Sequence, residues 1–214
     1  MNFSSASSRT LEEVVTQDMR TWLERAVIGL NLCPFAKAVH IKGQIHYVVS
    51  RASEPQELLE VLRRELADLQ TSDPVQRDTT LLMALCGFQD FLDFNDLLNQ
   101  AEQLVSDLGL DGVIQIASFH PQFQFAGTQV DDISNFTNRA PYPTLHLLRE
   151  DSVERAVDAF PEAELIFEKN IKTLEQLGHA GWAALDLNAK AVSPPVDQVS
   201  QDQASHANRG KIKP

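Results

Sequence analysis

Apolar residues recur at helical spacing in the first part of the chain. From about residue 10 to residue 32 they lie three or four positions apart and form one continuous stripe. Thr10 and Glu13 have the spacing of a capping box, in which each side chain bonds the backbone N–H of the other residue. This pattern predicts an N-terminal amphipathic helix that buries one face.

Segments typical of strands alternate with segments typical of helices in the middle of the chain. Strand-like runs lie at residues 45–50, 79–86 and 113–119, and the last two are apolar enough for strands buried on both faces. Helical patterns at about 53–69, with Ser53 and Gln56 as a capping pair, and at 90–108 separate them. A strand–helix–strand order predicts neighbouring parallel strands.

The remaining pattern predicts an additional strand and two helices. Residues 145–149 suit an edge strand, and helices are expected at 152–160 and at 161–177, where Gly178 would end the last one. The expected fold is therefore α/β, with a mainly parallel sheet of three to four strands flanked by helices and the N-terminal helix packed across it.

Composition limits the class of protein. The chain has 214 residues, with 30 acidic and 18 basic side chains, and its formal charge of −12 argues against nucleic-acid binding. It contains no apolar run near the roughly 20 residues of a membrane helix, and because residues 1–9 are polar and rich in Ser, no signal peptide is expected. Its two cysteines suit a reducing cytoplasm. We expect a soluble cytoplasmic protein that does not bind membranes.

One globular domain accounts for most of the chain. We expect it to span residues 1–188, with a flexible start at 1–9. Residues 189–214 are rich in Pro, Ser, Gln and Asp and have few large apolar side chains, so they are expected to form a disordered tail.

The connection between Phe119 and Thr144 is the strongest candidate for a site. Its 24 residues show no period, and loops of this length are uncommon inside a compact domain unless they are functional or disordered. It also leaves the end of a predicted strand, where open α/β sheets bind ligands. Its candidate residues are His120, Asn135, Asn138, Arg139 and Tyr142. The alternative is that its Asn and Pro residues only form turns.

Two arginines are candidate anion ligands. Arg139 lies among amides and prolines in the long loop, and Arg51 follows the first predicted strand at the same edge of the sheet. If they converge, they could bind a carboxylate or phosphate in an acidic protein. The alternative is an ordinary salt bridge for each of them.

Cys33 is a candidate nucleophile. Pro34 follows it, so Cys33 could be the N-cap of a short helix, where the helix dipole lowers a thiol pKa. Cys33, His120 and Asn135 or Asn138 would then supply the parts of a Cys–His–Asn site. The alternative is a buried cysteine that acts as a small apolar residue. The histidines have no zinc-motif spacing, so no metal site is expected.

Several of these segments together resemble a known family. They are Asn31-Leu32-Cys33-Pro34-Phe35-Ala36, His120-Pro121-x-Phe123-x-Phe125, Ser134-Asn135-x-Thr137-Asn138-Arg139-Ala140-Pro141-Tyr142-Pro143 and Leu145-His146-Leu147-Leu148-Arg149. Over about residues 10–186 the chain resembles an uncharacterised bacterial family, domain of unknown function 1415. The resemblance implies no reaction, cofactor or partner.

Two functions follow from these residues. The first is an enzyme that acts on a small anionic metabolite, with Arg139 and Asn138 binding and His120 as general acid or base. The second is a non-catalytic module that binds a small ligand or a protein through the same loop, with Tyr142 and Phe136 as anchors. The cofactor and the oligomeric state stay open.

Overall fold

A four-stranded mixed sheet forms the centre of the computed structural model, which describes residues 9–160 and 162–190. The strands are β1 (Ile45–Ser50), β2 (Thr79–Ala84), β3 (Ile114–Phe119) and β4 (Thr144–Arg149), in the order β1-β2-β4-β3. β1 and β2 are parallel, whereas β4 is antiparallel to both of its neighbours. The α/β class and the shared sheet are confirmed.

The prediction that residues 145–149 form an edge strand of a mainly parallel sheet was wrong. The segment expected at the edge, β4, lies inside the sheet, and β3 forms an edge instead. β3 was predicted to be fully buried, but of its six residues only Ile114 is buried. The cause is the connection from β3 to β4, which returns to the same end of the sheet without a helical crossover, so Phe119 pairs with Thr144. The sheet is therefore mixed, not mainly parallel.

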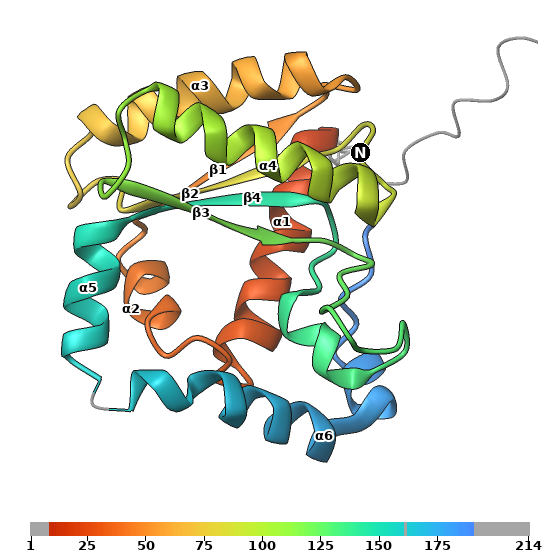
Figure 1. Cartoon of the computed structure of the whole chain (residues 1–214). Coiled ribbons are helices and arrows are strands. Elements are labelled where there is room, and N and C mark those ends of the chain that lie inside the picture. The colour runs from red at the N-terminus through yellow and green to blue at the C-terminus, as the bar shows by residue number, and fades with distance from the viewer. Residues whose placement is uncertain (1–8, 161, 191–214) are drawn as a thin grey trace, which may run out of the picture.

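Two long helices cover one face of the sheet. α3 (Pro55–Thr71) and α4 (Phe91–Asp107) lie side by side above it in Figure 1. Their leucine faces close this layer, together with Leu145 and Leu147 of β4 and Ile114 of β3. Leu58, Leu62, Leu66 and Leu69 of α3 are each no more than 1% exposed, so this half of the core is tightly sealed.

Helices of very different lengths lie on the other face. They are α1 (Leu11–Trp22), the π-helix Leu23–Ile28, α2 (Ala36–Ile41), α5 (Glu150–Asp158) and α6 (Ile166–Ala184), with 3-10 turns at Ile133–Asn138 and Ala163–Leu165. α1 and the π-helix pack on β1 and β2, whereas α6 crosses at a distance below the sheet (Figure 1). This half of the core is less continuous.

The helix boundaries differ from the predictions at three places. The capping box is confirmed, since Thr10 Oγ1 and Glu13 Oε2 each accept the other residue's backbone N–H. The predicted first helix, however, ends as an α-helix at Trp22. Glu54, not Ser53, is the N-cap of α3, and Glu57 accepts the Ser53 N–H. Gly178 kinks α6 through a positive φ of 64°, and the helix continues to Ala184.

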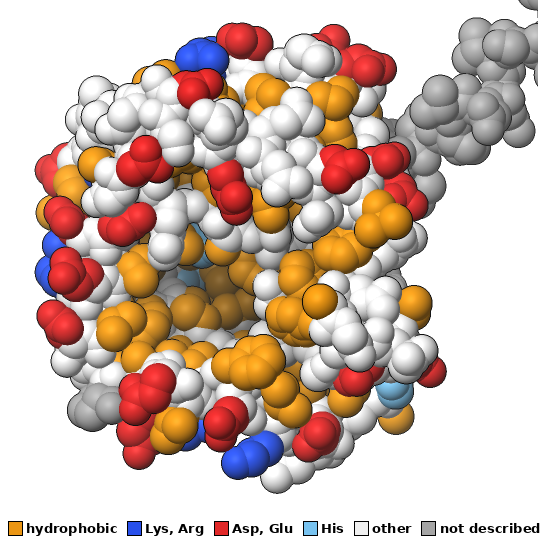
Figure 2. Space-filling view, in the orientation of Figure 1, with side chains coloured by type: hydrophobic (Ala, Val, Ile, Leu, Met, Phe, Trp, Pro, Cys, Tyr) orange, Lys and Arg blue, Asp and Glu red, His pale blue; other side chains and the backbone are white. Residues whose placement is uncertain are grey.

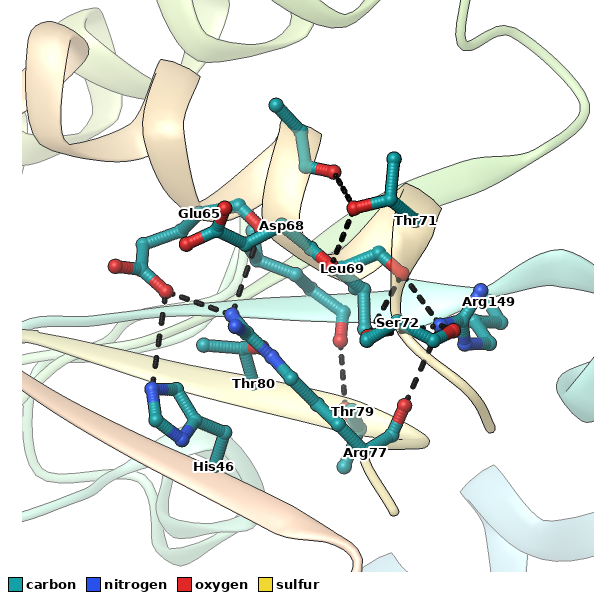
Figure 3. A network of polar contacts seen from close by, with 12 residues as sticks. His46, Glu65, Asp68, Leu69, Thr71, Ser72, Arg77, Thr79, Thr80 and Arg149 are labelled. Atoms are coloured by element: carbon teal, nitrogen blue, oxygen red, sulfur yellow. Dashed lines mark hydrogen bonds and ion pairs between the residues drawn. The ribbon is translucent and has the colours of Figure 1, made fainter. Parts of the chain in front are cut away.

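A polar network closes the end of the sheet opposite the long loop (Figure 3). Arg149, at the end of β4, donates to the carbonyl oxygens of Leu69 and Ser72 at the C-terminal end of α3. Arg77 pairs with Glu65 at 2.6 Å and also donates to Thr80. Because these charges are largely shielded from water and hydrogen bonded, they fix α3 to the ends of β2 and β4.

Because β4 lies inside the sheet, we expect a large loss of stability when one of its buried side chains is shortened. Leu147 is fully buried between the sheet and the α3/α4 layer, so we expect Leu147→Ala to lower the free energy of unfolding by about 2–5 kcal/mol. Urea unfolding measures this change. The control is Val130→Ala, because Val130 is 69% exposed; equal effects of the two substitutions would contradict the inner position of β4.

Candidate functional site

The loop between β3 and β4 begins and ends at adjacent points of the sheet. Phe119 and Thr144 are register partners, and the His120 N–H donates to the Asn138 carbonyl oxygen at 3.2 Å. Between them the chain forms a 3-10 turn, Ile133–Asn138, which Asp132 caps by accepting the Ser134 N–H. The loop is therefore an ordered excursion of a hairpin.

His120 lies inside the molecule. Its side chain is fully buried and contacts the rings of Phe91 and Phe94, with centroid distances of 5.4 and 5.2 Å. Nδ1 accepts the Gln122 N–H at 3.0 Å, so Nε2 carries the proton and donates to the Phe88 carbonyl oxygen at 3.0 Å. Desolvation lowers the pKa of His120. This neutral imidazole joins the loop to the segment that precedes α4.

The two candidate asparagines also bond to the backbone. Asn135 is fully buried; its Oδ1 accepts the Phe125 N–H and the Thr128 hydroxyl, and its Nδ2 donates to the Gln129 carbonyl oxygen at 2.8 Å. Asn138 Nδ2 lies 3.4 Å from the carbonyl oxygen of Ser118 in β3. Asn135 therefore holds the tip of the loop in shape.

Arg139 connects both halves of the loop. Its Nε donates to the Phe123 carbonyl oxygen at 3.2 Å and its Nη2 to the Val130 carbonyl oxygen at 2.6 Å. The guanidinium carbon lies 4.2 Å from the centre of the Phe136 ring. Among the described residues, nothing accepts a hydrogen bond from Nη1. Arg139 thus holds the loop together and still has one free amino group.

α1 supplies two residues that the sequence reasoning missed. Asp18 is buried, and its Oδ2 accepts the Tyr142 hydroxyl at 2.8 Å and the Lys190 N–H at 2.7 Å. Trp22 Nε1 donates to the Arg139 carbonyl oxygen at 2.8 Å. A signal was present, since Asp18 is a carboxylate within the apolar stripe of the first helix. These bonds fix the loop against α1.

A cleft of about 510 Å³ lies where the loop meets α6, and we call it the loop–α6 cleft. The part of α6 beyond the Gly178 kink contributes His179 and Trp182, whose rings lie edge-on to Phe136 at 5.4 and 5.2 Å. The cleft is lined by Trp22, Pro121, Phe136, Arg139, Ala140, Pro141, His179, Trp182, Ala183, Leu187, Asn188 and Ala189. It is an aromatic cleft with one guanidinium.

The predicted convergence of two arginines does not occur. Arg51 follows β1 at one edge of the sheet, whereas Arg139 lies beside β3 at the other edge. The Arg51 guanidinium bonds Glu12 of α1 at 2.6 and 2.9 Å, the salt bridge named as its alternative. The sheet order separates the two cations, because two strands lie between β1 and β3.

Cys33 is not a helix N-cap and does not meet His120. The N-cap of α2 is Phe35. The Cys33 side chain packs against the core on the α1 face of the sheet, whereas His120 contacts Phe94, on the α4 face. Burial raises the pKa of the thiol. The predicted Cys–His–Asn arrangement is therefore not formed.

His146 is a third residue that the sequence reasoning did not select. It lies in β4, and its Nε2 is 2.8 Å from Thr79 Oγ1, which itself donates to the Leu147 carbonyl oxygen at 2.6 Å. Because the hydroxyl proton is used, Nε2 must be the donor to Thr79. Desolvation by burial lowers the pKa of His146 to about 4. A histidine between Leu145 and Leu147 was the available signal.

Family comparison identifies the chain. Residues 14–184 match the model of the family "Protein of unknown function (DUF1415)", and the chain belongs to this family. No curated protein and no solved structure matches it. Within residues 9–160 and 162–190, no helix is long and apolar enough to cross a bilayer. The same residues hold no group of three or more His, Cys, Asp or Glu side chains arranged as metal ligands.

The predicted ends of the chain fall mostly outside the described residues. This applies to the flexible start, except Arg9, and to the tail after Lys190. The first two residues of that tail are described: Ala189 lines the loop–α6 cleft and Lys190 bonds Asp18.

The low pKa of His146 predicts that the folded protein becomes less stable in acid. This pKa is about 4 in the folded state and about 6.5 in an unfolded chain. Below pH 6.5 the unfolded state therefore binds a proton that the native state does not bind. As a result, the free energy of unfolding falls by roughly 2 kcal/mol by pH 5. The free energy of unfolding, measured with urea at pH 7.5 and pH 5, should differ less between the two pH values in His146→Gln than in the wild type. The control is His179→Gln, which replaces an exposed histidine; an unchanged difference in His146→Gln would refute the assignment.

Cys33 should react slowly with alkylating agents. Because burial raises its pKa, we expect its iodoacetamide labelling rate to keep rising above the ordinary thiol pKa of about 8.5. Mass spectrometry of a Cys86→Ser variant, which retains Cys33 as its one thiol, measures this rate. Rapid labelling near pH 7 would instead indicate a stabilised thiolate.

Proposed function

We propose that this member of the DUF1415 family is a small-ligand-binding protein whose site is the loop–α6 cleft. The observation that carries the proposal is the grouping of Trp22, Phe136 and Trp182 around the partly exposed guanidinium of Arg139. Side chains of α1, the loop and α6 meet there, and further contacts hold them in place. Trp22 donates to the Arg139 carbonyl oxygen, Trp182 packs against Phe136, and the Arg139 guanidinium donates to the Val130 carbonyl oxygen. The cleft is thus preformed, which favours affinity.

The chemistry of the cleft favours a planar anion. Aromatic side chains pack well against a flat apolar group. The free Nη1 of Arg139 can donate to a carboxylate or phosphate, a bond that is stronger when both partners are charged. A volume of about 510 Å³ is within the range of small-molecule sites. Benzoate and phenyl phosphate are simple representatives of this class.

Binding is favoured over catalysis by the hydrogen bonding of the loop. In the enzyme hypothesis His120 would transfer protons, but both of its ring nitrogens bond backbone groups and its side chain is fully buried. Asn135 is equally occupied. An enzyme using this cleft would depend on His179, the histidine that lines it.

Intrinsic fluorescence provides a direct test. The chain has two tryptophans, Trp22 and Trp182, and both line the cleft. We expect benzoate or phenyl phosphate to change the emission saturably and the neutral benzamide to bind more weakly. Arg139→Gln should weaken benzoate binding roughly 10- to 100-fold, the loss expected for a charged hydrogen bond, and leave benzamide binding nearly unchanged.

The controls separate binding from folding. Arg139 also supports the loop, so circular dichroism must first show that Arg139→Gln remains folded at the assay temperature. Arg155→Gln removes a cation from α5, away from the cleft, and should bind benzoate as the wild type does. The proposal fails if neither anion binds, or if folded Arg139→Gln binds benzoate with unchanged affinity.

A further inference from the structure

A second concavity lies on the α1 side of the sheet. Figure 2 shows a deep hollow whose walls are mostly hydrophobic, while acidic side chains are spread over the surrounding surface. Comparison with Figure 1 places it below the sheet and between α2, α5 and α6. The hollow is therefore formed where the short helices leave part of the sheet uncovered.

Side-chain alternation identifies the part of the sheet that faces this side. Leu145 and Leu147 point into the α3/α4 core, so His146 between them points to the opposite side. Ala117 of β3 is the register partner of His146 and shares its face. Both residues are partly exposed, although β4 has a strand on each side. Their exposure requires an opening on the α1 side, and a histidine is visible at the back of the hollow in Figure 2.

His146 keeps one ring nitrogen that can accept a hydrogen bond. Its Nε2–H donates to Thr79 Oγ1, which fixes the tautomer and leaves the lone pair on Nδ1. Within the described part of the chain, nothing donates to Nδ1. The ring also lies 6.0 Å from that of Phe119, so the acceptor is set among apolar groups.

The frame of the hollow is held by aromatic contacts. Phe35, before α2, packs edge-on against Phe160, after α5, at 5.9 Å. Phe125 of the long loop makes the same kind of contact with Phe167 of α6, also at 5.9 Å. These pairs connect separate elements of the layer, so the opening is maintained without a ligand.

We propose that the hollow is a ligand site for a small, uncharged, apolar molecule that donates one hydrogen bond to Nδ1 of His146. Hydrophobic walls exclude a charged ligand, because its desolvation would not be compensated. A neutral imidazole with a free lone pair selects for a hydroxyl or N–H group on an otherwise apolar molecule. The proposal does not involve Arg139 or the loop–α6 cleft.

The probe for this site is N-phenyl-1-naphthylamine, a neutral fluorophore that has a single N–H donor and emits strongly in apolar surroundings. We expect saturable binding to the wild type, and binding about fivefold weaker for the N-methylated analogue, which has no donor. In His146→Leu this preference should disappear, while the N-methylated probe still binds. Ala117→Phe should abolish binding of both probes, because it fills the space beside His146.

Leu92→Ser is the matched control, since Leu92 is 71% exposed on α4, on the other side of the sheet. Thermal unfolding must show that each variant is folded, and His146→Gln replaces His146→Leu if the latter is not. The proposal is overturned if the wild type shows no saturable binding or if folded Ala117→Phe binds the probe as the wild type does. It is also overturned if the preference for the N–H probe persists without His146.

Discussion

The antiparallel pairing of β3 with β4 is the interaction on which the rest of the structure depends. It joins Phe119 to Thr144 and thereby forces a connection of 24 residues to leave and re-enter the sheet at the same end. It also inserts β4 between β2 and β3, so that Leu145 and Leu147 contribute to the α3/α4 layer of the core. The position of the loop, of His146 and of both concavities follows from this pairing.

A loop of this length is ordered because its buried polar groups bond one another. Asn135 and His120 are fully buried, and their side chains satisfy backbone groups that would otherwise be costly to remove from water. Asp18 and Trp22 then hold the loop on α1. The residues with the most conspicuous chemistry thus form a rigid support, and the accessible chemistry lies beside them, on Arg139 and the aromatic rings.

The two faces of the sheet differ in how completely helices cover them. α3 and α4 have 17 residues each and seal their face with leucines. On the other face α2 has six residues and α5 has nine, and α6, although it has 19 residues, crosses at a distance from the sheet. Apolar surface that is not covered by the chain itself costs free energy in water and marks binding surfaces. Both proposed sites lie on this incompletely covered side.

The sequence determined the elements and the class of fold, because hydrophobic periodicity and capping residues are local properties. The first helix with its Thr10–Glu13 cap, all four strands and the α3 and α4 helices follow from it. The sequence also located the loop that shapes the cleft. Strand order was decided only by tertiary structure, since the same apolar run suits an inner or an edge strand. Tertiary structure also decided which candidate groups can bind a ligand. Both ring nitrogens of His120 bond backbone groups, those of Phe88 and Gln122. The guanidinium of Arg51 bonds Glu12, which is 39 residues away in the sequence.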